Sequence, residues 1–104
     1  MCLGVPAVVI DIDEGSGIVK IDYGDGIVRE ALLGISEERV ARGDIVVIHA
    51  GVVVSKFSIE GLYEQIEFIR KLLNDFEDNS SLEGLIVLYQ NVIQLAERLK
   101  GSDG

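Results

Sequence analysis

Hydrophobic and polar positions follow two different periods along the chain, and the change falls near residue 58. Before that point, short β-branched runs are separated by turns rich in Gly, Asp and Ser, which is typical of a small all-β barrel or sandwich. The runs occupy residues 3–13, 18–23, 27–34, 44–51 and 51–57. We therefore expect residues 1–57 to form a small five-stranded β-barrel.

The residue patterns of individual segments predict which strand faces are exposed and where the chain turns. In residues 18–23 apolar side chains alternate with Lys20 and Asp22, so the face that carries these two charges is predicted to be exposed. The stretch "DIVVIHAGVVV" shows no such alternation and is predicted to be buried on both faces. "YGDGI" predicts a tight hairpin, because glycine adopts the positive φ that such turns need. "SEERVARGD" has a helical composition, is too short for more than one or two turns, and is interpreted as the crossing segment of the barrel.

Beyond residue 58, apolar positions recur at steps of three and four residues, which is the period of an amphipathic α-helix. One stripe covers residues 59–76, and Ser58 is a candidate N-cap. A second stripe covers residues 82–100, where Ser80 and Glu83 have the spacing of a capping box. The sequence therefore predicts a mainly β fold with two C-terminal amphipathic helices.

We expect residues 58–78 to form a C-terminal helix packed on the barrel, and residues 79–104 to form an additional helix with "GSDG" as a frayed tail. The apolar stripe of the additional helix is too long to be left in water. An antiparallel hairpin within one chain is favoured, because its short connection makes closure cheap, and the protein is then a monomer. A homodimer that pairs through helix 82–100 is the alternative.

Composition excludes several classes of protein. At 104 residues the chain is one domain, and its formal net charge of −9 repels phosphate backbones and anionic lipid surfaces. No apolar run reaches the roughly 20 residues of a membrane span, and no basic segment precedes the first strand. A single cysteine fits a reducing compartment. We expect a cytoplasmic protein that binds neither nucleic acid nor membrane.

The only cysteine stands at position 2, in "MCLGVPAVVI". Initiator methionine is normally trimmed before a small residue, which would leave a free amine and a thiol on Cys2. Their reference pKa values of about 8 and about 8.5 allow a metal to displace both protons, so the pair is a ready two-point ligand. The alternative interpretation is a small hydrophobic residue that starts a strand.

His49 is the other candidate for chemistry, and it lies in the apolar run "VVIHAG". In a regular strand it shares a face with Ile45 and Val47. It is either a hydrogen-bonded core histidine or a metal ligand, since neutral imidazole is the commonest protein ligand for metals. One Cys and one His cannot build a closed tetrahedral site. A metal held here would need ligands from another protein.

Three segments together resemble the hydrogenase-formation chaperone family called HypC or HupF. They are "MCLGVP" at the start, the "DYGDGIVREA" hairpin and "GDIVVIHAGVVVSKF", followed by an amphipathic helix. The resemblance runs from residue 1 to about residue 76. The chain departs from the usual family opening at Ala7 and Val8, where a glycine and a basic residue are more common.

The resemblance implies an OB-like barrel that acts as a [NiFe]-hydrogenase maturation chaperone and is not an enzyme. Members work with a larger iron–sulfur partner, HypD, on which iron receives cyanide and carbon monoxide, and then engage the hydrogenase large-subunit precursor. Iron is then a transient cargo, Fe(CN)₂CO, shared with the partner and not held permanently. Cys2 matches the position that contacts the iron and the partner. His49 matches the family's histidine, either as an iron ligand or as structural support.

The partner-binding segment that the resemblance implies consists of Cys2, Leu3, Gly4, Val5 and Pro6. Two other classes of function remain open. One is a small OB-type protein-interaction adaptor with no metal role. The other is an enzyme with an N-terminal cysteine nucleophile, for which only His49 could be the base and no loop of oxyanion donors is evident.

Overall fold

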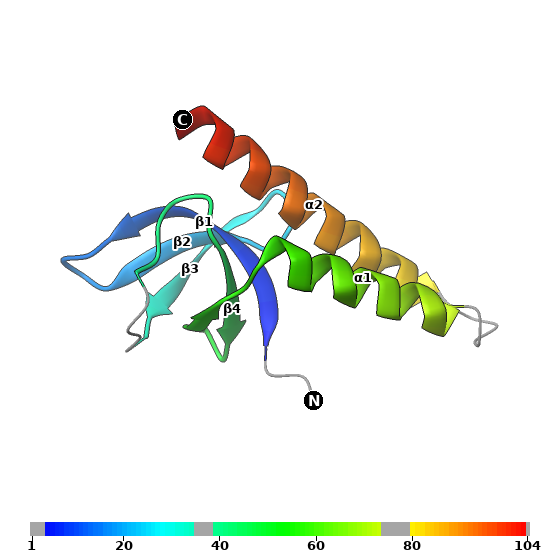
Figure 1. Ribbon diagram of the computed structural model, residues 1–104. Helices are drawn as coiled ribbons and strands as arrows, with labels where there is room; N and C mark the ends of the chain where they lie inside the picture. Colours follow the sequence, from blue (N-terminus) through cyan, green and yellow to red (C-terminus); the bar gives the residue numbers. More distant parts are fainter. Residues whose placement is uncertain (1–3, 35–38, 74–79, 104) are drawn as a thin grey trace.

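The structure, a computed structural model, describes residues 4–34, 39–73 and 80–103 (Figure 1). Five strands precede two helices: β1 (Val5–Asp13), β2 (Ile18–Asp22), β3 (Val28–Leu33), β4 (Ile45–His49), β5 (Val52–Lys56), α1 (Ile59–Leu73) and α2 (Ser80–Asp103). The strands close into a barrel in the order β1-β2-β3-β5-β4. The predicted five-stranded barrel followed by two helices is confirmed.

The barrel is closed by one short parallel seam. β3 pairs with β5 only through Leu32 with Val52 and Leu33 with Val53, whereas every other neighbouring pair of strands is antiparallel. Two antiparallel strands can be joined by a short turn, whereas two parallel strands need a longer crossover. Here the chain between β3 and β5, which includes β4, is that crossover. The predicted hairpin between β2 and β3 is present, with Gly24 at a φ of 98°.

Side chains that point into the barrel form one apolar cluster. Alternate residues of each strand contribute to it, as the period of a pleated strand requires. Its buried members are Ala7, Val9, Val19, Ile21, Ala31, Val46, Ile48 and Val53. Most of these residues are β-branched, which suits a pleated surface that is packed on one side.

A second apolar cluster lies between the outside of the barrel and the helices. Val8 and Ile45 supply the barrel side, and the helices supply Leu62, Ile66, Ile69, Ile86, Val92, Ile93, Ala96 and Leu99. α2 makes the main contact with β1 and β4, whereas α1 packs chiefly against α2 (Figure 1). The predicted hairpin of helices within one chain is therefore confirmed, but α2 rather than α1 is the main cover of the barrel.

The helix ends differ in part from the prediction. The Ser58 hydroxyl accepts a hydrogen bond of 2.9 Å from the Gly61 amide, so its role as N-cap of α1 is confirmed. α2 continues to Asp103, so the frayed tail expected after residue 100 is wrong for residues 101–103. The predicted capping box rests on the Ser80 side chain, which lies outside the described residues, as do residues 74–76 of the first predicted helix.

One strand prediction needs correction, and the crossing segment is described only in part. Asp22 was expected on an exposed face, but it is only 7% exposed, because α2 lies over that end of the hairpin. Its carboxylate remains hydrogen-bonded, as a buried charge must be. The crossing segment shows no helix over the described residues 39–44, only a turn at Arg42 and Gly43, and residues 36–38 lie outside the described part.

Candidate partner-docking site at the start of the barrel

The segment predicted to bind a partner lies along β4. Val5 pairs with Ile48 and Pro6 pairs with Val47 in an antiparallel ladder. Cys2 and Leu3 lie outside the described residues, so only Gly4, Val5 and Pro6 of the predicted segment can be placed. These three begin the chain's path into the barrel beside the C-terminal end of β4.

Gly4 is held against the backbone of β4. A Cβ atom at this position would collide with the carbonyl oxygen of Ile48 and would lie 2.7 Å from Cγ1 of Val47. Any other residue would therefore push the start of the chain away from β4. The absence of a side chain at Gly4 fixes where the N-terminal segment leaves the barrel.

Pro6 is buried and occupies a part of β1 with a strand on one side only. The ladder between β1 and β2 begins at Val8, so Pro6 is paired with β4 alone. A proline cannot donate to a ladder, and positions with one free edge tolerate it. Pro6 thus stiffens the start of β1 without breaking a hydrogen bond between strands.

The prediction that this strand is buried on both faces is confirmed for Ile45, Val46 and Ile48 and is wrong for His49, which is exposed. Ile45, Val46 and Ile48 of β4 are buried, but His49 ends the strand and pairs with Val52 across the turn to β5. The turn consists of Ala50 and Gly51, with φ values of 53° and 79°. A two-residue turn with two positive φ values is tight, and it presents the His49 side chain on the outside.

The register brings His49 and the N-terminal segment to the same end of the barrel. Val5 lies opposite Ile48, and His49 is the next residue along β4. Val5, near the start of the described chain, and His49 therefore share one end of the barrel.

A shallow hollow of about 260 Å³ adjoins this segment. Its lining comes from the start of the chain, from β4 and β5, and from the beginning of α1: Gly4, Pro6, Val47, Val54, Ser55, Phe57 and Gln65. Most of these side chains are apolar. The hollow can accept an apolar side chain of another molecule next to the exit of the N-terminal segment.

Metal ligands do not cluster in the part of the chain that the structure describes. Residues 4–34, 39–73 and 80–103 contain no group of three or more His, Cys, Asp or Glu side chains placed to hold a metal ion. Cys2 lies outside these ranges. Among described residues, His49 is the only imidazole or thiol at this end of the barrel, and one such ligand leaves most of a coordination sphere open.

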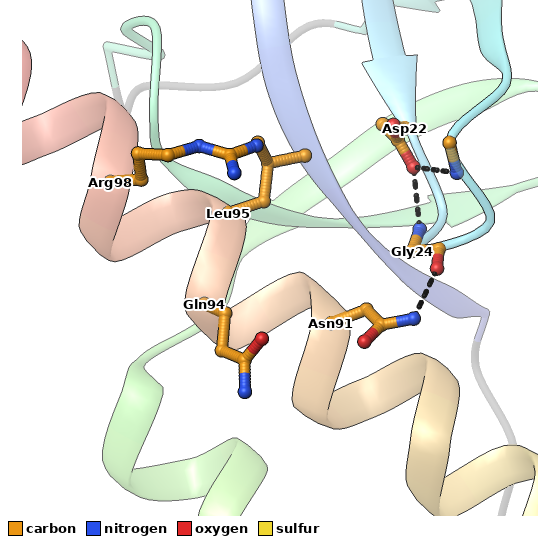
Figure 2. Close-up of a pocket in the computed structure, with 7 residues that line it drawn as sticks. Asp22, Gly24, Asn91, Gln94, Leu95 and Arg98 are labelled. Carbon is orange, nitrogen blue, oxygen red and sulfur yellow. Dashed lines mark hydrogen bonds between the residues drawn. The ribbon is translucent and has the colours of Figure 1, made fainter.

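A second groove, of about 250 Å³, lies between α2 and the turn from β2 to β3 (Figure 2). Oδ1 of Asp22 accepts hydrogen bonds from the amides of Gly24 (2.7 Å) and Gly26 (3.3 Å). Nδ2 of Asn91 on α2 donates to the Gly24 carbonyl oxygen at 2.8 Å. These contacts tie α2 to the hairpin, so the groove is part of a seam that holds the fold together.

The polar contacts that position α2 could not be found in the sequence. Asp22, Asn91 and Gly24 form one set, and Asp44 with Lys100 forms another. Partners 56 or more residues apart leave no local signal. One hint was available, because Asp22 directly precedes the "YGDG" turn, where a carboxylate can bond the amide two residues on.

No helix in the described ranges has the length and apolar character needed to cross a membrane. A sequence profile of the HupF/HypC family matches residues 1–69, which is the barrel and most of α1. The chain is also 33% identical over 85 residues to the hydrogenase maturation factor HypC of Helicobacter hepaticus (strain ATCC 51449 / 3B1). That alignment covers 80% of this chain and 96% of the relative. The chain therefore belongs to the HupF/HypC family.

Proposed function

We propose that this protein is a [NiFe]-hydrogenase maturation chaperone, that it works in the cytoplasm as a monomer, and that it is not an enzyme. Family membership and the similarity to a hydrogenase maturation factor support this function. It works with a HypD-type partner to assemble the Fe(CN)₂CO group and carries that group to the hydrogenase large-subunit precursor. Iron is cargo in this scheme and is shared with the partner.

The observation that carries the proposal is the shared location of His49 and the N-terminal segment. Val5 pairs with Ile48, the residue directly before His49, and the His49 side chain is exposed. A ligand on a free chain end can reach into a cleft of another protein. An exposed imidazole at the same end can approach the same iron or a group on the partner.

Cys2 supplies the thiolate in this proposal. On binding iron, its thiol gives up its proton, and the free amine left by removal of Met1 is a second donor on the same residue. His49 is a second contact, as an iron ligand or as a support for the partner. Leu3, Gly4, Val5 and Pro6 contact the partner, and the adjoining apolar hollow receives one of its side chains.

Co-purification tests the proposal. In this experiment, the chain is purified from cells that make a [NiFe]-hydrogenase, and a co-purifying HypD-type protein is sought. The iron content of the complex and the hydrogenase activity of the cells are then compared for wild type, Cys2→Ala and His49→Ala. Glu64→Ala on the exposed side of α1 is the matched control. We expect Cys2→Ala to fold, to lose iron from the complex and to abolish maturation. His49→Ala should lower the iron content, and Glu64→Ala should change nothing.

The adaptor alternative makes the opposite prediction for Cys2→Ala. A protein without a metal role keeps its partner, the iron content of the complex and hydrogenase activity when the thiol is removed. The purified chain alone should hold iron weakly, since one thiolate, one amine and one imidazole leave an open coordination sphere. Stoichiometric iron that survives chelator treatment of the pure chain would refute a site shared with a partner.

A further inference from the structure

β3 has an open edge over its first half. β2 pairs with β3 along its whole length, from Asp22 opposite Val28 to Ile18 opposite Leu32. On the other side, β5 reaches only Leu32 and Leu33. The segment from Val28 to Ala31 thus has a strand on one side only. Unpaired strand edges are templates for pairing with another chain.

The hydrogen-bond pattern identifies which backbone groups lie on that edge. The Leu33 amide donates toward β2, to the Gly17 carbonyl at 2.7 Å, whereas the Leu32 amide donates away from it, to Gly51 at 2.8 Å. Because directions alternate along a strand, the N–H and C=O groups of Val28 and Glu30 also point away from β2. In the described part of the chain these groups have no hydrogen-bond partner.

Side chains beside these groups are exposed and largely apolar. Val28 is 53% exposed and Leu32 is 57% exposed, and both lie on the outer face of β3 with Glu30 between them. Glu30 has Lys20 of β2 opposite it on one side. None of the ion pairs among the described residues involves Glu30. An edge with exposed apolar side chains is unusual for a strand that stays unpaired.

We propose that the open edge of β3 from Val28 to Ala31 binds an extended segment of a partner protein, which adds a strand to the barrel. The segment carries a basic residue and an apolar residue at alternate positions, so that its cation lies opposite Glu30 and its apolar side chain lies opposite Val28. Backbone groups of Val28 and Glu30 supply the hydrogen bonds. The chain's net charge of −9 favours approach of a basic segment.

A second copy of this chain fits the edge poorly. Antiparallel pairing in which Val28 and Glu30 both lie opposite residues of the other copy's β3 has two registers. One places Glu30 opposite Glu30 of the other copy, and the second places Arg29 opposite Arg29. Like charges directly opposite each other destabilise a strand pair. The site is independent of iron carriage by Cys2, so the two proposals can fail separately.

The test uses the full chain and a probe peptide, acetyl-Thr-Val-Thr-Lys-Thr-Val-Thr-amide, followed by amide NMR shifts. We expect the largest shifts at Val28 and Glu30. A matched peptide with Glu in place of Lys should bind roughly two- to five-fold more weakly, the range of one cross-strand charge pair. N-methylation of the peptide amides that face β3 should abolish binding, and methylation of the alternate amides should not.

Two protein variants complete the test. Glu30→Gln keeps the shape and removes the charge, so the preference for the Lys peptide should disappear. Glu30→Pro removes an amide that points to the open edge and leaves the ladder with β2 intact, so the fold should persist while binding is lost. Shifts centred elsewhere, equal binding of the Lys and Glu peptides, or self-association that increases in Glu30→Gln would overturn the proposal.

Discussion

Lys100, near the C-terminal end of α2, places its ammonium nitrogen 2.6 Å from Oδ1 of Asp44, the residue that precedes β4. The second carboxylate oxygen of Asp44 accepts a hydrogen bond of 2.8 Å from the Ala41 amide and lies 3.4 Å from Nζ of Lys56. The Asp44 side chain is 12% exposed. One carboxylate thus joins three separate segments, and it holds α2 across the barrel.

Replacing this carboxylate should weaken the fold in a pH-dependent way. Burial raises the pKa of Asp44, but the hydrogen bonds from Lys100 and Ala41, with the charges of Lys100 and Lys56, outweigh burial and lower it overall. A lowered folded-state pKa stabilises the protein above the unfolded value of about 3.9, and this stabilisation is lost as pH falls through the folded value. Asp44→Asn should cost about 1 to 2 kcal/mol at pH 7, because Lys100 is half-exposed.

Urea unfolding from pH 7 to pH 3 measures this difference. The gap between wild type and Asp44→Asn should narrow below about pH 4, where the unfolded wild-type chain takes up a proton at Asp44 while the folded protein, whose Asp44 pKa is lowered, stays ionised. Lys100→Met should cost less than Asp44→Asn, and Lys71→Met on the exposed side of α1 is its control. A gap that stays constant down to pH 3 would show that the charge of Asp44 does not hold α2.

Gly24 and Gly26 lie in the same turn, so alanine substitutions at the two positions distinguish the cost of backbone strain from the cost of packing against α2. Gly24 and Gly26 both have positive φ, 98° and 80°, so alanine at either position is strained by roughly 1–2 kcal/mol. A Cβ at Gly24 would also collide with the Leu88 carbonyl oxygen and lie 3.2 Å from Val92, whereas a Cβ at Gly26 meets nothing within 4 Å. Gly24→Ala should therefore cost roughly 1–3 kcal/mol more than Gly26→Ala, the usual range for overpacking. Equal losses in urea unfolding would mean that α2 does not rest on this turn.

His49→Ala should leave the melting temperature almost unchanged. His49 is exposed at the end of β4, and exposed substitutions usually change stability by less than about 0.5 kcal/mol. Ile48→Ala, one residue earlier and buried in the barrel, is the matched comparison and should cost roughly 2–5 kcal/mol. A large loss of stability in His49→Ala would restore the interpretation of a structural core histidine.

The turn beside His49 contains a strained residue that can be relieved. Ala50 adopts a φ of 53°, where a Cβ costs roughly 1–2 kcal/mol. Ala50→Gly removes this strain but also increases the conformational entropy of the unfolded chain, which lowers stability. The net effect should be a gain in stability of up to about 1 kcal/mol. Ala41→Gly, exposed and without positive φ, should lower stability by roughly 0.4–1 kcal/mol. Thermal unfolding of both variants measures these changes. A loss of stability in Ala50→Gly would show that Ala50 is not strained in the folded protein.

The strands, the β2–β3 hairpin and the helix start at Ser58 could be predicted from the sequence because their signals are local. Alternating apolar residues and turn glycines act over a few neighbours, and Ser58 needs only the amide three residues on. The burial of Asp22 could not be predicted, since it depends on α2, about 70 residues later. The same holds for the carboxylate of Asp44, whose nearest cation comes from Lys100.

The placement of His49 shows a different limit. Its apolar neighbours predicted burial, but β4 ends at this residue, and a strand end lies in solvent even when the strand interior is packed. The register that sets the start of β1 beside His49 also depends on long-range pairing, so the sequence could not predict that Val5 and His49 lie at the same end of the barrel. The relationship between Cys2 and His49 in the iron site stays a prediction.

Two arrangements would bury the apolar face of α2: packing on the barrel of its own chain, or pairing with a second copy. Ile93 is buried in the second apolar cluster, and Val87 on the same helix is 53% exposed. If α2 covers its own barrel, Ile93→Ala opens a cavity and costs roughly 2–5 kcal/mol, while Val87→Ala stays within about 0.5 kcal/mol. The mass in solution should be that of a monomer for wild type and for both variants. Deletion of residues 79–104 should then expose Val8 and Ile45 and cause a large loss of stability without a change of oligomeric state. A wild-type dimer that becomes a stable monomer on deletion would show that α2 serves association instead.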